Sequence, residues 1–416
     1  MLKKDISFLL ERGVAEVIVR EELERLLREG KPLRLKMGFD PSRPDIHLGH
    51  AVGLRKLRQF QELGHRVILI VGDWTAQIGD PSGQSATRPM LSAEEVKANA
   101  QTYLDQFFKV VDRDRTEVRW QSEWFGSFDL GDVIKLTSRF PVAQLLARDD
   151  FSKRYAAQKP IAITEFLYPL LQAYDSIMIE ADVEFGGTDQ KFNLLLGREL
   201  QGMMGQRPQQ CLLVPILVGT DGSKRMSKSL DNYIGIDEPP RDVYFKVMRL
   251  KDDLMLDYFE LATDLPEEEL KGLRQALADR SVNPMDIKKR LAREIVAQFH
   301  GPEAAMKAES EFERVVQRRE SPDQLIELQL ASIPVSPRTT EPNLQASLPQ
   351  LFVQVGAVSS ASEGRRLIDG GGVEVNGVRV DSYTVPLGRL APDTLIKAGK
   401  RHVIKIVDAD VAEPGK

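Results

Sequence analysis

The chain has 416 residues, of which 42% are hydrophobic and 29% charged, the composition of a folded globular protein rather than a disordered or fibrous one. At roughly 100 to 200 residues per domain, this length predicts two to four domains and excludes a small module stabilised by disulfide bonds. The net charge of −5 argues against a strongly basic nucleic-acid-binding protein but leaves room for a local basic patch.

Cysteine and histidine usage and the apolar runs exclude further classes. The one cysteine, Cys211, cannot form an internal disulfide, and the five histidines are scattered, so we expect no structural zinc and name no metal ligand. The N-terminal apolar stretch is interrupted by Glu11 and Arg12, and no apolar run approaches the ~20 residues of a membrane-spanning helix. We therefore expect a cytoplasmic protein with no signal peptide and no membrane partner.

Residues 33–80 predict a βαβ unit. The apolar PLRLKMGF predicts a strand, and RVILIVG predicts a second, fully buried one. Between them, HLGHAVGLRKLRQFQEL has Leu48, Val52 and Phe60 near helical spacing, whereas Arg55 and Lys56 are expected to face away. Strand, helix and strand in this order imply a parallel sheet.

The whole chain is expected to divide into four parts. ADVEFGG and CLLVPILVG predict two more buried strands with a helix between them, so residues 1–230 are expected to form a Rossmann-like α/β catalytic domain. Residues 231–332 have a helical, charge-rich pattern with prolines at the breaks, which predicts an all-α domain. The Pro-, Ser- and Thr-rich stretch 333–346 predicts a linker. A small α+β domain, mildly basic by charge count, is expected over residues 347–416.

Two segments are suited to bind phosphate. GFDPSRPDIHLGH places Gly38, His47, Gly49 and His50 where a strand ends and a helix begins, and the free backbone N–H groups of a helix N-terminus favour an anion. DGSKRMSKSL is a basic loop after a strand. Taken singly, the first segment is equally typical of a helix cap with surface histidines, and the second is more typical of a solvated charge run. Together they resemble the two signature motifs of class I aminoacyl-tRNA synthetases.

A third segment, TEFLYPLLQAYDSIMI, carries a polar stripe. Tyr168, Gln172 and Asp175 stand at i, i+4 and i+7, so they share one face of a helix that is otherwise mostly apolar. The alternative is an ordinary surface face. Two strand-end loops, GGTDQKFN and GDWTAQIGDPSG, add polar groups where open α/β sheets bind ligands; these are Asp189, Gln190, Asp73, Thr75 and Asp80.

Six motifs in order resemble bacterial tyrosyl-tRNA synthetases over nearly the whole chain: GFDPSRPDIHLGH, GDPSG, YPLLQAYD, GGTDQ, RMSKSLDN and GAVSSASEGRRLIDGGGVEVNG. The last motif resembles an S4-type RNA-binding module. The resemblance implies tyrosine activation with ATP and Mg²⁺, transfer to tRNA(Tyr), and a homodimer. The implied catalytic residues are His47, His50, Arg225 and Lys228. The implied ATP-binding residues are Gly38, Asp40, Gly49, Gly187, Asp189, Lys228 and Ser229. The implied tyrosine-binding residues are Lys36, Asp80, Tyr168, Gln172, Asp175 and Gln190. The implied RNA-binding residues are Ser362, Arg365 and Arg366.

Two positions depart from the family pattern. Arg225 stands where the family has its first signature lysine, which keeps the charge but not the compact ammonium group. Lys36 stands where many members have a tyrosine that touches the substrate phenol, so a phenol contact by residue 36 is in doubt.

Three other functions are weighed against this one. A tryptophanyl-tRNA synthetase shares both signature motifs, but the S4-like tail and the stripe of Tyr168, Gln172 and Asp175 argue against it. A nucleotidylyltransferase that uses H-x-G-H would not need residues 240–416. A non-catalytic RNA-binding relative would be expected to have lost the signature histidines, and both are present. For the C-terminal module the alternative is a dimerisation tail.

Overall fold

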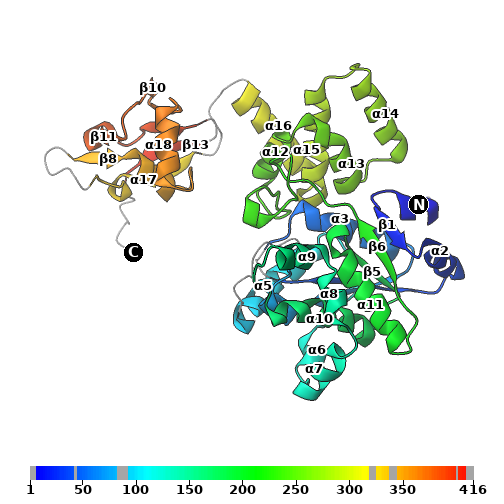
Figure 1. The fold of residues 1–416 in the computed structure, drawn as a ribbon. Helices are drawn as coiled ribbons and strands as arrows, with labels where there is room; N and C mark the ends of the chain where they lie inside the picture. Colours follow the sequence, from blue (N-terminus) through cyan, green and yellow to red (C-terminus); the bar gives the residue numbers. More distant parts are fainter. Residues whose placement is uncertain are drawn as a thin grey trace, which may run out of the picture. The chain divides into compact units, whose positions relative to one another are not determined.

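The computed structural model describes residues 6–41, 45–81, 92–317, 325–336, 344–399 and 402–408. The chain forms two compact units, Met1–Ala305 and Met306–Lys416 (Figure 1). Among the described helices, none has both the length and the apolar character that crossing a lipid bilayer requires.

A six-stranded sheet forms the centre of the first unit. Its strands are β1 (Glu16–Ile18), β2 (Arg34–Phe39), β3 (Arg66–Val71), β4 (Thr116–Trp120), β5 (Val183–Gly187) and β6 (Gln210–Val214). They lie in the order β1-β6-β5-β2-β3-β4, and all neighbours are parallel except β1 with β6. The chain runs outward from β2 through β3 and β4, then returns to the other side of β2 at β5. The carboxyl ends of β2 and β5 therefore mark the switch point where open α/β sheets bind ligands.

Sixteen α-helices are described up to residue 312, and the last of them crosses into the second unit. They are α1 (Ile6–Glu11), α2 (Arg20–Glu29), α3 (Leu48–Glu62), α4 (Thr75–Ile78), α5 (Ala93–Phe107), α6 (Ser122–Phe125), α7 (Leu130–Thr137), α8 (Val142–Leu146), α9 (Asp149–Ala156), α10 (Ile163–Met178), α11 (Lys191–Met203), α12 (Pro240–Met248), α13 (Met255–Ala262), α14 (Glu267–Ala278), α15 (Pro284–His300) and α16 (Pro302–Phe312). Helices α10 and α11 pack against each other, and α11 lies along β5 and β6.

The predicted βαβ unit is confirmed. Strand β2 pairs in parallel with β3, and α3 connects them with Leu54, Leu57 and Phe60 fully buried. The expectation for Arg55 and Lys56 was wrong, because neighbouring segments cover that side of α3. Arg55 forms an ion pair with Asp264 at 2.8 Å, and Lys56 donates to the main-chain oxygens of Leu9 and Arg12.

The strand predicted at 211–219 is shorter in the structure. Strand β6 ends at Val214, since the next residue, Pro215, has no N–H with which to continue the ladder. The helical stretch predicted after it is present as α12 to α16. Pro240, Pro284 and Pro302 open three of these helices, where a missing N–H costs nothing.

The second unit has its own hydrophobic core. Its strands are β7 (Ile326–Gln329), β8 (Gln345–Ser347), β9 (Val373–Val375), β10 (Val378–Arg379), β11 (Thr384–Pro386), β12 (Leu395–Ala398) and β13 (His402–Val407). Five of them form a sheet in the order β10-β9-β12-β13-β7, and β8 pairs with β11. Helices α17 (Leu348–Gln354) and α18 (Ala361–Asp369) pack together and contribute Leu351, Phe352 and Ile368 to the core. The predicted fold class, a parallel-sheet α/β domain followed by helices and a small α+β domain, is confirmed.

The stretch predicted as a linker contributes to this core. Ile333 and Ala346 of this stretch are buried in the same cluster as Phe352. Leu328, just before the stretch, is buried there as well, and its strand β7 pairs in parallel with β13. Residues 337–343 of the stretch lie outside the described part of the chain. The division of the chain at residues 230, 332 and 346 stays a prediction.

Candidate active site

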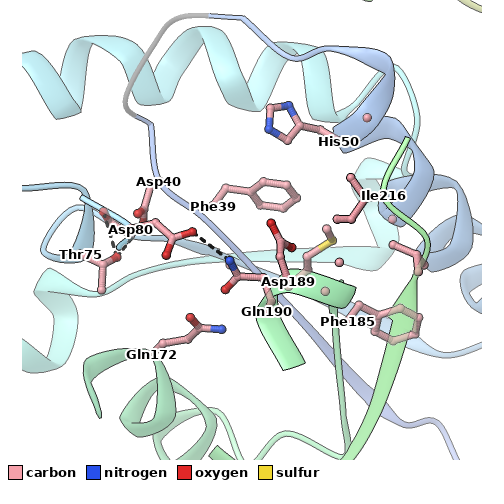
Figure 2. Close-up of a pocket in the computed structure, with 18 of the residues that line it drawn as sticks. Phe39, Asp40, His50, Thr75, Asp80, Gln172, Phe185, Asp189, Gln190 and Ile216 are labelled. Atoms are coloured by element: carbon pink, nitrogen blue, oxygen red, sulfur yellow. Dashed lines mark hydrogen bonds between the residues drawn. The ribbon is translucent and has the colours of Figure 1, made fainter. Parts of the chain in front are cut away.

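A cavity of about 630 Å³ opens at the carboxyl ends of β2 and β5 and gathers most of the predicted site residues. Those that line it are Gly38, Asp40, His47, Gly49, His50, Asp80, Tyr168, Gln172, Asp175, Gly187, Asp189, Gln190, Arg225, Lys228 and Ser229. Thr75 lines it as well, whereas Asp73, Lys224 and Lys36 are absent from the lining. Figure 2 shows His50 at one end and Gln172 and Thr75 at the other, with Asp189 and Gln190 between them.

Backbone hydrogen bonds join the two signature motifs. The N–H of Leu48 donates to the oxygen of Ile234 at 2.9 Å, and the N–H of Ile236 donates to the oxygen of Ile46 at 3.0 Å. These bonds hold the start of α3 beside the segment that follows the basic loop 221–230. Motifs that are far apart in the sequence therefore face the same cavity.

His47 and His50 form a stacked pair in the first turn of α3, with ring centroids 3.8 Å apart. Burial, then the charge of Lys228, lowers the pKa of His50 to about 4, and burial, then His50, lowers that of His47 well below its usual value. Both rings are therefore neutral at neutral pH. The Nδ1 of His50 accepts from the backbone N–H of His47 at 3.4 Å, which places the proton of neutral His50 on Nε2.

Two cations stand at the same end of the cavity. Lys228, in the short 3₁₀ helix η3 (Lys228–Leu230), donates to the main-chain oxygen of Asp45 and lies 5.5 Å from the centroid of the Tyr103 ring. Arg225 forms an ion pair with Asp189 at 2.7 Å. Burial raises the pKa of Asp189 and the charge of Arg225 opposes this effect. Two neutral imidazoles and two cations can together stabilise negative charge that develops on a phosphate.

Gly49 and Gly187 allow the backbone to approach a ligand closely. A Cβ on Gly49 would lie 3.0 Å from the ring of His47, and one on Gly187 would lie 2.8 Å from Oδ1 of Asp189 and from Ile216. Any side chain at these two positions would therefore displace groups that line the cavity.

The other end of the cavity is a network of carboxylates and their donors. The hydroxyl of Tyr168 donates to Asp40 at 2.8 Å, and Thr75 donates to the second oxygen of Asp40 at 2.7 Å. Gln190 donates to Asp80 at 2.9 Å (Figure 2). Burial, followed by the negative charge of Asp40, raises the pKa of Tyr168 well above its usual value.

Asp175 lies buried on α10 and accepts two hydrogen bonds. Gln121 donates at 2.8 Å to one oxygen, and the indole of Trp124 donates at 3.1 Å to the other. Burial raises the pKa of Asp175 to about 7, although Lys36 and both donors act in the opposite direction. Gln121 and Trp124 are not anticipated from the sequence. Gln121 directly follows β4, and this strand-end position is the one available signal.

The comparisons with known proteins identify the family. The family described as "tRNA synthetases class I (W and Y)" matches residues 28–317, and "S4 domain" matches residues 348–389. A "Tyrosine--tRNA ligase" of Dehalococcoides mccartyi is 58% identical over 97% of this chain and 98% of its own length. The chain belongs to the tyrosine–tRNA ligase family of class I tRNA synthetases.

Further members of the family agree in sequence and fold. The "Tyrosine--tRNA ligase" of Thermotoga maritima is 49% identical over 96% of both chains. The crystal structure described as "Tyrosyl-tRNA Synthetase complexed with L-tyrosine from Archaeoglobus fulgidus" has 25% identity and a TM-score of 0.59. The match covers 73% of this chain and 100% of the chain in that crystal structure. The resemblance inferred from the six motifs is confirmed.

One site residue expected for this family lies elsewhere. Lys36 was predicted to bind substrate, but its side chain is fully buried and forms an ion pair with Glu184 at 2.9 Å. Lys36 acts on Asp175 through its charge, which lowers the pKa of that carboxyl. The substrate-binding expectation is corrected, because the side chain of Lys36 is directed into the packing between the sheet and α10.

The predicted RNA-binding residues of the synthetase lie on α18. Ser362, Arg365 and Arg366 are exposed, whereas Gly364 and Ile368 are buried. The guanidinium group of Arg365 lies 5.8 Å from the ring centroid of Tyr383, which is itself exposed. Three polar groups are thus presented on one side of the helix, and their contact with RNA stays a prediction.

Proposed function

We propose that the chain activates L-tyrosine with ATP to form tyrosyl-adenylate and transfers the tyrosine to the 3′ end of tRNA(Tyr). The observation that carries this function is a single cavity that joins both class I signature motifs to the polar stripe of α10. Full-length identity of 58% to a tyrosine–tRNA ligase supports it.

In the first step, a carboxylate oxygen of tyrosine attacks the α-phosphorus of ATP and pyrophosphate leaves. The substrate supplies the nucleophile, so the protein acts by orienting the two reactants and by stabilising charge on the phosphates. His50 donates from Nε2 while it remains neutral, and Lys228 and Arg225 supply positive charge. Asp40, Asp189, Ser229 and the glycines at 38, 49 and 187 bind the nucleotide.

At the other end of the cavity, Asp175 accepts the hydrogen bond of the tyrosine phenol. Each of its oxygens already accepts one donor, which leaves a lone pair for the substrate. Tyr168, Gln172, Asp80 and Gln190 surround the ammonium group, whose charge suits the carboxylates at this end.

Magnesium enters with ATP and is held mainly by phosphate oxygens and water. This assignment fits the residues present, since no group of three or more metal-ligating side chains occurs in the described ranges. The ion neutralises phosphate charge when bound. A cytoplasmic location and a homodimer complete the proposal.

Exchange of pyrophosphate into ATP, measured with each of the twenty amino acids, tests this function. Tyrosine-dependent exchange is expected, with tRNA charging by tyrosine in a second assay. Exchange that depends on tryptophan instead would identify the other branch of the family. Exchange without any tRNA charging would favour a nucleotidylyltransferase.

A further inference from the structure

A buried ion pair lies outside the cavity lining, between the central sheet and α10. Lys36 on β2 and Glu184 on β5 are direct partners in the parallel register, and their side chains are 0% and 1% exposed. The ammonium group of Lys36 lies 2.9 Å from Oε1 of Glu184. A pair so completely removed from water gains little net stability over apolar residues of the same size, so stability alone does not account for it.

The pair makes direct contact with the helix that carries the polar stripe. Lys36 donates to the main-chain oxygen of Gln172 at 2.7 Å and to the hydroxyl of Ser176 at 2.8 Å. The side-chain amide of Gln172 donates to Oε1 of Glu184 at 3.1 Å. Gln172 is therefore held at its backbone by the cation and at its side chain by the anion.

A directed chain of amides runs from Glu184 into the cavity. Because a carboxylate only accepts, Gln172 must present Nε2 to Glu184 and Oε1 to Asn193, which donates to it at 3.1 Å. Asn193 donates also to Oε1 of Gln190 at 3.0 Å, and Gln190 donates to Asp80 at 2.9 Å. The orientation of both glutamines, which line the cavity, is thus fixed by acceptors at the two ends of the chain.

Helix α11 closes this network from the side. A Cβ on Gly197 would lie 2.8 Å from Nε2 of Gln209, 3.0 Å from the hydroxyl of Ser176 and 3.2 Å from Oε2 of Glu184. Gln209 also donates to Glu184. The network is packed too tightly for its members to exchange partners without moving α10 or α11.

The charges of the pair act on Asp175. Lys36 on β2 lowers the pKa of Asp175, and Glu184 on β5 raises it. Tyr168, on the same helix, is a third titratable group whose ionisation is coupled to that of Asp175. The remaining partners of Asp175 in the described structure, Gln121 and Trp124, are uncharged.

We propose that Lys36 and Glu184 are positioning residues for tyrosine recognition. Their ion pair fixes the amide orientation of Gln172 and Gln190 toward the ammonium group, and its cation favours the ionised form of Asp175 that accepts from the phenol. This inference rests on the proposed function. It assigns residue 36, whose phenol contact the sequence already puts in doubt, an action through α10 instead.

Three variants test the pair. Pyrophosphate exchange is measured from pH 5.5 to 9, with tyrosine as the varied substrate in one series and ATP in the other, to give the KM for each. Lys36→Met removes the cation at similar volume, Glu184→Gln removes the anion at the same shape, and the double variant removes both. Each is expected to raise the KM for tyrosine about ten-fold or more, as a lost hydrogen bond to a charged group does, with the KM for ATP nearly unchanged.

The acidic limb of kcat/KM for tyrosine gives a signature that a purely structural role would not produce. Loss of the cation raises the pKa of Asp175, so Lys36→Met moves the limb to higher pH. Loss of the anion lowers it, so Glu184→Gln moves the limb to lower pH. The acidic limb of the double variant is expected between those of the two single variants. It should lie above that of the unmodified protein, because Lys36 has the larger effect on the pKa of Asp175.

Lys288→Met is the matched control, because Lys288 is also buried in an ion pair, but its partners Asp252 and Leu250 neither line the cavity nor belong to α10. It is expected to lower the melting temperature without moving either KM or the acidic limb. If the variants of the pair behave like this control, the positioning role is wrong. If Lys36→Met does not fold, Glu184→Gln decides by the same criteria. Absence of tyrosine-dependent exchange in the unmodified protein would refute the proposed function instead.

Discussion

Lys228 places its ammonium group at the end of the cavity where phosphates are expected, beside the main-chain oxygen of Asp45 and the ring of Tyr103. A cation directed at a leaving pyrophosphate acts mainly in the transition state. Lys228→Ala is therefore expected to slow adenylate formation roughly 10²- to 10³-fold, with tyrosine binding nearly unchanged. Stopped-flow measurement of adenylate formation beside equilibrium tyrosine binding checks this.

Lys224 offers a matched control for Lys228, because it is exposed in the same loop but is absent from the cavity lining. Lys224→Ala is expected to retain the rate of the unmodified protein within about two-fold. Equal losses in the two variants would mean that the charge of the loop as a whole, rather than Lys228, acts on the phosphates.

Asp175 gives tyrosine binding a pH dependence near neutrality. Its pKa of about 7 in the free protein lies above that of an unfolded aspartate. Its contribution to the free energy of unfolding is therefore complete at low pH and is lost as pH rises through 7. A phenol that donates to Asp175 requires the ionised form. Tyrosine affinity is therefore expected to weaken below pH 7, by up to about ten-fold per pH unit. Calorimetric titration between pH 6 and 8.5 measures it.

Asp175→Asn separates this effect from other titrations. The variant is expected to lose the pH dependence and to reduce kcat/KM for tyrosine by about 10²-fold at pH 8, with a smaller change for phenylalanine. The two histidines do not interfere in this range, since His50 titrates near pH 4 and His47 also far below its usual pKa. A pH dependence that survives the substitution would assign phenol recognition to another group.

Single elements differ in how far their roles follow from sequence. Helix α10 is predictable because Tyr168, Gln172 and Asp175 repeat at helical spacing, and periodicity carries that information. The partners of Asp175 cannot be predicted in this way, because Gln121 lies directly after β4 and Trp124 lies in the short helix α6. Lys36 is misjudged for the same reason: its ion pair depends on the cross-strand register of β2 and β5, which no local pattern encodes.

Helix α7 presents an apolar face, which we expect a second copy of the chain to cover in the proposed dimer. Leu130 and Ile134 stand at i and i+4 with 74% and 58% exposure. Adjacent exposed side chains of this size mark interaction surfaces. A double substitution, Leu130→Asp with Ile134→Asp, is expected to convert the proposed dimer to monomer in sedimentation velocity measurements.

The control for this helix is Val378→Asp, since Val378 is 69% exposed in the other unit of the chain. It is expected to leave the sedimentation coefficient unchanged. A protein that sediments as a monomer before any substitution would refute the dimer, and equal dissociation by both variants would remove α7 from the interface.

At the scale of the whole molecule, changes in composition along the chain predict that separate domains exist, but they predict the domain boundaries less well. The basic C-terminal region can be predicted from its charge and its motif. The Pro- and Thr-rich stretch before it nevertheless contains two buried residues, Ile333 and Ala346, which its composition does not predict. Strand β7 precedes that stretch and still pairs with β13. A cut at residue 346 would therefore strip β13 of its parallel partner, whereas a cut before β7 keeps the core of the second unit together.

Deletion of residues 318–416 is expected to separate the two half-reactions. The cavity is lined by residues 37–229, so tyrosine-dependent pyrophosphate exchange should persist within about two-fold, while tRNA charging falls about ten-fold or more. In the full chain, Arg365→Gln with Arg366→Gln should weaken tRNA binding and reduce the slope of log affinity against log salt by about 0.7 for each lost phosphate contact. Charging by the truncated protein at the rate of the full chain would assign the second unit a role other than RNA binding. An unchanged salt slope would move the RNA contact away from α18.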